Sequence, residues 1–133
     1  MDSNRRKAVS MNNSDSRTFV NFTNHPSENW NADQKHAALK YGSIVDIMFP
    51  QVDPKATEAD IKALAEKYVS EILKLRPEAV LCQGEFNLCY VVINMLKAEG
   101  VTVVAACSNR VVKDTPEGKI SKFVFVQFRE YKE

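Results

Sequence analysis

The chain has 133 residues, of which 44% are hydrophobic and 26% charged, with a formal net charge of +1 at pH 7. This length suits one domain with a sizeable core, and the near-neutral charge argues against a large basic face for duplex nucleic acid. The sequence contains no run of about 18 apolar residues and no N-terminal signal core, so we expect no membrane span and no secretory leader.

Three cysteines, Cys82, Cys89 and Cys107, each lie in an apolar run. An odd number without a Cys-x-x-Cys pair predicts buried, reduced thiols in a cytoplasmic protein. The two histidines offer no zinc spacing, so we expect no metal site.

Residues 1–17 are rich in Asn, Ser, Arg, Lys and Asp and contain few large apolar side chains. Such a segment cannot bury enough surface to order itself, so we expect a disordered tail, and Met11 is an alternative start. Residues 18–133 are expected to form one α/β domain.

Strand-like and helix-like patterns alternate after the tail. A β-prone run at residues 18–22 leads into a polar loop at residues 23–29. A helix is expected at residues 31–41, where Asn31 resembles an N-cap, and a second strand at residues 44–48.

A long amphipathic helix is expected to begin at Thr57. It leads into the apolar run at residues 79–82, which is typical of a strand buried on both faces. Gly84 interrupts this run, and helical spacing of apolar residues continues from Phe86 until Gly100.

A fourth strand is expected at residues 101–106, again continuously apolar. A polar loop at residues 107–110 follows it. Two last β-runs, at residues 110–113 and 120–129, are expected to pair around a turn at residues 114–118.

The order β-α-β-α-β-α-β-β-β with right-handed crossovers predicts a three-layer, Rossmann-like α/β fold, in which helices cover both faces of a parallel sheet. We expect the parallel strands in the order 2-1-3-4, with 3-2-1-4 as the alternative. The C-terminal β-hairpin is expected to extend the sheet in antiparallel fashion.

Three polar loops leave the carboxyl ends of the predicted parallel strands, where open α/β sheets bind ligands. Their hydroxyls, amides, imidazole and guanidinium suit a ligand with phosphates, ribose hydroxyls and base edges. The candidate residues are Thr23, Asn24, His25, Ser27, Gln83, Glu85, Asn87, Ser108, Asn109 and Arg110.

Several candidates also fit ordinary structural roles. Glu85 stands where a carboxylate complements a helix N-terminus, and it would repel a phosphate there. His25 is also typical of an exposed loop, and Arg110 of a strand residue paired with a carboxylate. The chain has neither a Gly-x-Gly-x-x-Gly pattern nor a P-loop, so NAD binding and ATP hydrolysis are poor candidates.

Short motifs spread over about residues 18–131 carry a family resemblance. They are Phe19-Val-Asn-Phe-Thr-Asn-His-Pro-Ser27, Tyr41-Gly-Ser-Ile-Val-Asp46, Phe49-Pro50, Gln83-Gly-Glu-Phe86, Ala106-Cys-Ser-Asn-Arg110 and Phe128-Arg-Glu-Tyr131. Together they resemble a family of small CRISPR-associated proteins related to CARF (CRISPR-associated Rossmann fold) domains and to stand-alone ring nucleases.

The resemblance implies a CARF-like domain that binds a cyclic oligoadenylate at the carboxyl edge of the sheet, across a homodimer axis. By position, the family's ligand loops correspond to Thr23–Ser27 and Gln83–Asn87, which adds Gly84 and Phe86 to the candidates. From the length of the chain we expect no fused effector domain, and the basic residue usual near the phosphates is not in the second loop. Arg110 is the expected substitute.

Ring nucleases of this kind need no metal or other cofactor, because the ribose 2′-hydroxyl attacks the adjacent phosphate and leaves a 2′,3′-cyclic phosphate. The candidate catalytic residues are His25, Ser108 and Arg110. Arg110 and the N–H groups of residues 85–87 would stabilise the phosphate charge, while His25 or Ser108 would orient or deprotonate the hydroxyl. Two alternatives stay open: a non-catalytic cyclic-nucleotide-binding regulatory module, and an unrelated α/β protein that acts on another phosphorylated small molecule.

A homodimer is predicted from the helix that begins at Phe86. Beside the stripe that covers the sheet, this helix has a second apolar stripe formed by Phe86, Cys89, Tyr90 and Ile93. Such a stripe needs either a partner or another helix to cover it.

Overall fold

Five strands form one mixed sheet in the computed structural model, which describes residues 16–133. The strands are β1 (Thr18–Phe22), β2 (Ser43–Asp46), β3 (Ala79–Cys82), β4 (Thr102–Thr115) and β5 (Gly118–Glu130). Their order is β2-β1-β3-β4-β5, with β5 antiparallel to β4 and all other pairs parallel. The predicted parallel order 2-1-3-4 is confirmed, and the alternative 3-2-1-4 is wrong.

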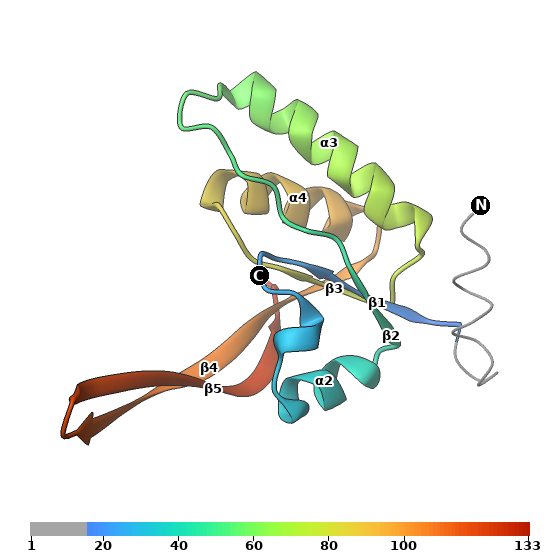
Figure 1. Cartoon of the computed structure of the whole chain (residues 1–133). Coiled ribbons are helices and arrows are strands. Elements are labelled where there is room, and N and C mark those ends of the chain that lie inside the picture. The colour runs from blue at the N-terminus through green and yellow to red at the C-terminus, as the bar shows by residue number, and fades with distance from the viewer. Residues whose placement is uncertain (1–15) are drawn as a thin grey trace.

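Helices connect the parallel strands. They are the 3-10 helix η2 (Ser27–Asn29) and the α-helices α2 (Ala32–Leu39), α3 (Glu58–Lys74) and α4 (Phe86–Ala98). In Figure 1, α3 and α4 lie on one side of the sheet and α2 lies on the other. The prediction of an α/β fold with a C-terminal antiparallel hairpin is therefore confirmed. Within residues 16–133, no helix combines the length and apolarity needed to cross a membrane.

The central strands β1 and β3 are buried on both faces, which the unbroken apolar run of β3 predicted for that strand. Alternate side chains point to opposite faces of a strand. The cluster on the α3 and α4 side therefore contains Val20, Phe22, Val80 and Cys82. The cluster on the α2 side contains Phe19, Ala79 and Leu81.

The helix starts follow their capping residues. Thr57 Oγ1 accepts from the backbone N–H of Asp60 (3.1 Å), and Asp60 Oδ2 accepts from that of Thr57 (2.9 Å). This capping box satisfies two N–H groups that the first turn leaves without partners, so α3 begins where its sequence predicted. Helix α2 is shorter than predicted, although Asn31 does cap it through the N–H of Gln34.

The main correction concerns β4. The sequence predicted a strand at residues 101–106, a polar loop at residues 107–110 and a separate strand after it. Instead β4 continues without a break and pairs with β5 along its length, with one β-bulge at Cys107/Ser108. The polar residues after Cys107 do not form a turn, because β5 pairs with their backbone and their side chains are exposed.

The outer part of the β4–β5 hairpin projects from the rest of the protein (Figure 1). β3 pairs with β4 only as far as Val104, so β4 continues outward with β5 beside it.

The predicted tail, residues 1–17, lies outside the described residues except for its last two positions. The carbonyl of Arg17 accepts a hydrogen bond from the N–H of Ser43 (3.0 Å). Residue 17 therefore belongs with the sheet and not with the tail.

Candidate functional site

A buried polar network shapes the loop after β1. Asn21 is only 1% exposed, and its Nδ2 donates to the carbonyl of His25 (2.9 Å) and to Asp46 Oδ1 (3.0 Å). Thr23 Oγ1 donates to Asn21 Oδ1 (2.8 Å) and accepts from the N–H of His25 (3.0 Å). These bonds fix the path of the loop that carries His25.

Asp46, at the end of β2, holds the same loop from its other side. Its Oδ2 accepts from the N–H of Ser27 (3.1 Å) and from Ser27 Oγ (3.2 Å). Sequence reasoning gave Asp46 no role. The sequence feature that could have revealed its role is a carboxylate at the end of an otherwise apolar strand, beside a polar loop.

The ring of Phe49 explains why the residue at position 84, after β3, is glycine. A Cβ at position 84 would lie 2.5 Å from a ring atom of Phe49, so only glycine fits there without displacing the ring. Next to it, Gln83 Oε1 accepts from the N–H of Ala106 (2.6 Å) and connects the end of β3 to the inner part of β4.

Glu85 is the N-cap of α4. Its Oε1 accepts from the N–H of Leu88 (2.8 Å), which confirms the structural role considered for it. A carboxylate at this helix end disfavours a phosphate beside it. The geometry therefore argues against the N–H groups of residues 85–87 as the main phosphate contact.

A cavity of about 780 Å³ lies at the carboxyl edge of the sheet, on the α2 side. Its volume falls in the range of small-molecule sites, roughly 300–1,000 Å³. The residues that line it come from the loop after β1, η2, α2, the end of β3, the inner part of β4, and β5. They are Thr23, His25, Pro26, Asn29, Trp30, Asn31, Gln34, Leu81, Gln83, Ala106, Ser108, Lys122 and Phe123.

Four of the predicted site residues meet at this cavity: Thr23, His25, Gln83 and Ser108. The others do not line it. They are Asn24, Ser27, Gly84, Glu85, Phe86, Asn87, Asn109 and Arg110.

Arg110, the predicted phosphate contact, lies on the exposed hairpin. Its Nε and Nη2 donate to Ser121 Oγ, at 3.1 and 2.9 Å. The cation that lines the cavity is Lys122, which sequence reasoning missed together with Phe123. The pairing of β5 with β4 brings these residues to the edge. The sequence predicted that hairpin, but not that its residues border the cavity.

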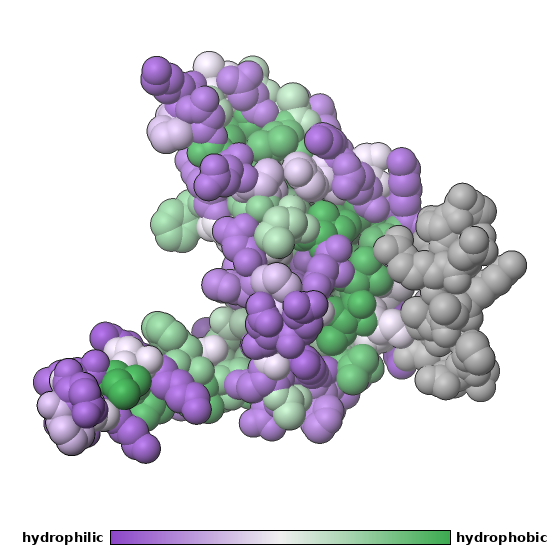
Figure 2. Space-filling model, in the orientation of Figure 1, coloured by the Kyte–Doolittle hydropathy of each residue, from purple (hydrophilic) through white to green (hydrophobic). Residues whose placement is uncertain are grey.

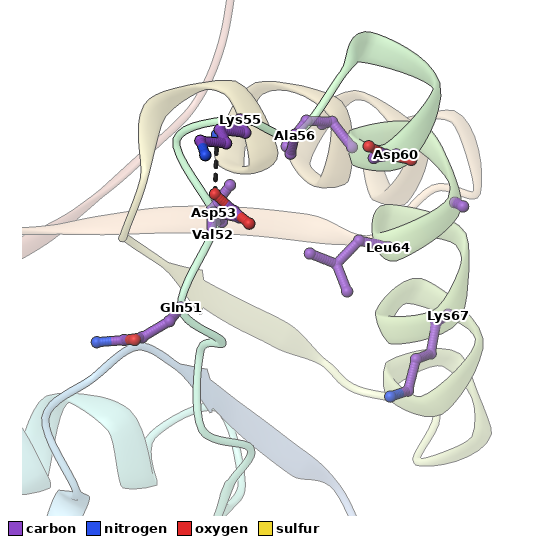
Figure 3. A pocket seen from close by; sticks show the side chains of 10 residues that line it. Gln51, Val52, Asp53, Lys55, Ala56, Asp60, Leu64 and Lys67 are labelled. Atoms are coloured by element: carbon purple, nitrogen blue, oxygen red, sulfur yellow. Dashed lines mark hydrogen bonds between the residues drawn. The ribbon is translucent and has the colours of Figure 1, made fainter.

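A second cavity, of about 550 Å³, lies between the loop after β2 and helix α3 (Figure 3). Its carboxylates already have structural partners. Asp53 accepts from the N–H of Lys55 (2.9 Å), and Asp60 belongs to the capping box. We therefore take the cavity at the carboxyl edge as the candidate site.

Two buried thiols lie beneath the loop after β3. Cys82 Sγ donates a hydrogen bond to Cys89 Sγ across 3.8 Å, which raises the pKa of Cys82 and lowers that of Cys89. The Tyr131 hydroxyl donates to the carbonyl of Cys82 (3.2 Å), and burial raises the pKa of Tyr131. All three cysteines are free, but Cys107 is only half-buried.

Within residues 16–133, no group of three or more His, Cys, Asp or Glu side chains is placed to hold a metal ion.

The fold and the cavity define an α/β protein with a ligand-sized site, lined by both polar and apolar side chains, at the carboxyl edge of a mixed sheet. The chain belongs to the uncharacterized protein MJ1673 family, whose sequence model matches residues 17–129. No curated protein matches the chain. The family description names neither CRISPR nor CARF proteins.

Proposed function

We propose that the protein is a CARF-like domain with a three-layer Rossmann-like fold, which binds a cyclic oligoadenylate and opens its ring in type III CRISPR antiviral signalling. One observation carries the proposal. Thr23, His25, Gln83 and Ser108 come from three distant segments with motif resemblance to ring nucleases, and all four line one cavity.

The cavity offers groups that suit an adenine nucleotide. Phe123, which is exposed, provides an aromatic face for stacking a base, and the buried Leu81 and Trp30 add apolar wall beside it. The amides of Asn31 and Gln34 have the donor and acceptor pair that recognises adenine edges. Lys122 supplies a positive charge for phosphate.

The proposed ring opening requires proton transfers but no cofactor. His25 takes the proton of a ribose 2′-hydroxyl, and that oxygen forms a bond to the adjacent phosphorus. The bond from phosphorus to the 5′-oxygen breaks, and the 5′-oxygen takes up a proton. Ser108 orients the attacking hydroxyl, while Lys122 stabilises the phosphate charge.

A cytoplasmic homodimer is part of the same proposal. Helix α4 leaves two aromatic side chains in solvent, Phe86 at 89% and Tyr90 at 71% exposure. The other members of the predicted stripe, Cys89 and Ile93, pack into the domain core. The unpartnered part of the stripe is therefore the aromatic pair alone.

The non-catalytic binding module is the second candidate, and the position of Arg110 favours it. The guanidinium is hydrogen-bonded to Ser121 and does not line the cavity. A binding module needs less cationic charge at the phosphate than a catalyst does.

The two histidines separate these candidates. His25 lines the cavity, whereas His36 lies exposed on α2 and serves as the matched control. We expect His25→Ala to slow the opening of cyclic tetra-adenylate by roughly 100-fold or more, with binding nearly unchanged, and His36→Ala to have no effect. Wild-type turnover in His25→Ala would refute the proposed role of the imidazole. Tight binding without turnover by the unmodified protein would favour the binding module.

A further inference from the structure

Two thiols contact each other in the core, at the junction of β3 and α4. Cys82 is the last residue of β3, and Cys89 lies near the start of α4. The Cys82 thiol donates a hydrogen bond to the Cys89 sulfur across 3.8 Å. Both side chains belong to the apolar cluster between the sheet and helices α3 and α4, where Figure 2 shows hydrophobic side chains gathered behind a hydrophilic surface. Neither thiol lines the cavity, so the proposed ring opening leaves the pair without a role.

The two sulfur atoms are close enough to form a disulfide with small movements. The sulfurs of a disulfide are about 2.05 Å apart, so each sulfur would have to move by roughly 0.9 Å from the observed separation of 3.8 Å. Residues 83–85, which join β3 to α4, form a short bend that includes Gly84. Side-chain rotation together with a shift of this bend supplies such a movement.

The surroundings of the two thiols make them chemically unequal. Hydrogen bonds from the Cys82 thiol and from the backbone of Gly84 lower the pKa of Cys89, against the opposing effects of burial and of the Glu85 carboxylate. The thiolate is the nucleophilic form of cysteine. Exposure gives the same order of reactivity, because Cys82 has no exposed surface whereas 8% of Cys89 is exposed. A water-sized reagent therefore meets Cys89 first.

We propose that Cys89 is a peroxide-reactive thiol and that Cys82 converts its oxidised form into an intrachain disulfide. The Cys89 thiolate attacks one oxygen of hydrogen peroxide, the O–O bond breaks, and the other oxygen takes up a proton and leaves as water. Cys89 is then a sulfenic acid. The Cys82 sulfur attacks the Cys89 sulfur, the S–O bond breaks, and the hydroxyl leaves as water with the Cys82 proton. The two thiols lose two electrons and two protons in all, and the peroxide is reduced to two water molecules.

The disulfide would act on the candidate site through Gln83. This residue directly follows Cys82, lines the cavity, and accepts a hydrogen bond from the N–H of Ala106 (2.6 Å). A bond that draws the end of β3 toward α4 shifts Gln83 relative to β4 and weakens that hydrogen bond. Oxidation would therefore alter one edge of the cavity, whichever ligand the cavity takes.

The number of free thiols in the full chain tests the proposal. All three cysteines are free in the structure, and we expect excess hydrogen peroxide to lower the count from three to one and dithiothreitol to restore it. Peptide mapping without reductant should identify the bond between Cys82 and Cys89. Cys107 is the matched control, because it is more exposed than either member of the pair, and exposure alone predicts that it reacts first. The Cys107→Ser variant should lose both of its remaining thiols.

Two further variants separate the steps of the reaction. In Cys82→Ser, Cys89 should stop at the sulfenic acid, which dimedone traps. In Cys89→Ser, both remaining thiols should survive the same treatment, and Cys89→Ala provides a second variant if the hydroxyl is not tolerated in the core. Circular dichroism confirms the fold of each variant. In the wild-type chain, oxidation should make the amide of Ala106 exchange faster with deuterium.

A wild-type chain that keeps all three thiols in peroxide would overturn the proposal, as would a disulfide that includes Cys107. Loss of the Cys82 thiol in Cys89→Ser would also overturn it, because Cys82 would then react without its partner. An unchanged exchange rate at Ala106 would refute the link to the cavity. These measurements are made without nucleotide, so a failure of the ring-nuclease proposal would leave them standing.

Discussion

Replacing Gly84 by alanine should destabilise the domain through one contact. The new Cβ would lie 2.5 to 2.6 Å from three ring atoms of Phe49, where ordinary contact begins at 3.4 Å. Phe49 is 2% exposed, and its ring centroid lies 4.7 Å from that of Phe22, so the ring has little room to retreat. Overpacking of this kind costs about 1–3 kcal/mol.

Thermal and urea denaturation measure this loss. We expect the melting temperature of Gly84→Ala to fall by roughly 3–12 °C, from the usual relation between stability and melting temperature for a domain of this size. Phe49→Leu provides the control, because a smaller side chain makes room for the new methyl group. The double variant should be more stable than the sum of the single losses predicts, by about 0.5–3 kcal/mol.

Two results would refute this reasoning. Wild-type stability of Gly84→Ala would mean that the Phe49 ring does not pack against residue 84. Strictly additive losses in the double variant would mean that the glycine is required for another reason.

Four further predictions concern the network, the cations, the C-terminus and the tail. Asp46→Ala should lower ligand affinity severalfold in calorimetry by releasing the loop that carries His25; unchanged affinity would argue against a positioning role. Arg110→Ala should weaken binding of an anionic ligand by about 1.5–3 kcal/mol if its guanidinium contacts phosphate, and Lys122→Ala is the parallel variant from the cavity wall. If both variants bind the ligand as tightly as the parent does, the phosphate site has been assigned to the wrong residues. Tyr131→Phe should have a free energy of unfolding about 1 kcal/mol lower than the parent at pH 8, because its hydrogen bond is lost. In urea titrations between pH 9 and 11, its free energy of unfolding should decline less than that of the parent. Deleting residues 1–15 should leave the melting temperature within about 2 °C; a larger loss would show that this segment stabilises the domain.

The sign of the Tyr131 effect follows from its burial, which raises the pKa above the ordinary value of 10.0. The folded state therefore holds this proton more tightly than the unfolded state does. The resulting stabilisation is fully present below pH 10.0 and is lost as the pH rises through the raised pKa. An equal alkaline decline in the parent and in Tyr131→Phe would contradict this assignment.

Local signals predicted the central part of the fold. The unbroken apolar run of β3 correctly indicated a strand buried on both faces, and the Thr57–Asp60 capping box marked the start of α3. β4 was misread because Ser108, Asn109 and Arg110 are polar enough for a loop. Their strand conformation depends on pairing with β5, and the sequence predicted that pairing only from residue 110 onward.

The candidate site was predictable to a similar degree. The loops after β1 and β3 were identified from their position at strand ends, and His25 and Gln83 do meet at the cavity. Lys122 and Phe123 reach it only through the hairpin register. Asp46 acts through hydrogen bonds to Asn21 and Ser27, which spacing in the sequence does not reveal.

The most direct test of the proposed function is to incubate the protein with cyclic tetra-adenylate, with and without a metal chelator, and to resolve the products by chromatography and mass spectrometry. The proposal predicts linear products that end in a 2′,3′-cyclic phosphate, formed equally well in the chelator. Calorimetry on the same samples measures binding without turnover. A protein that neither binds nor cleaves cyclic oligoadenylates of any ring size would contradict the proposal and would favour another phosphorylated small molecule as the ligand of the cavity.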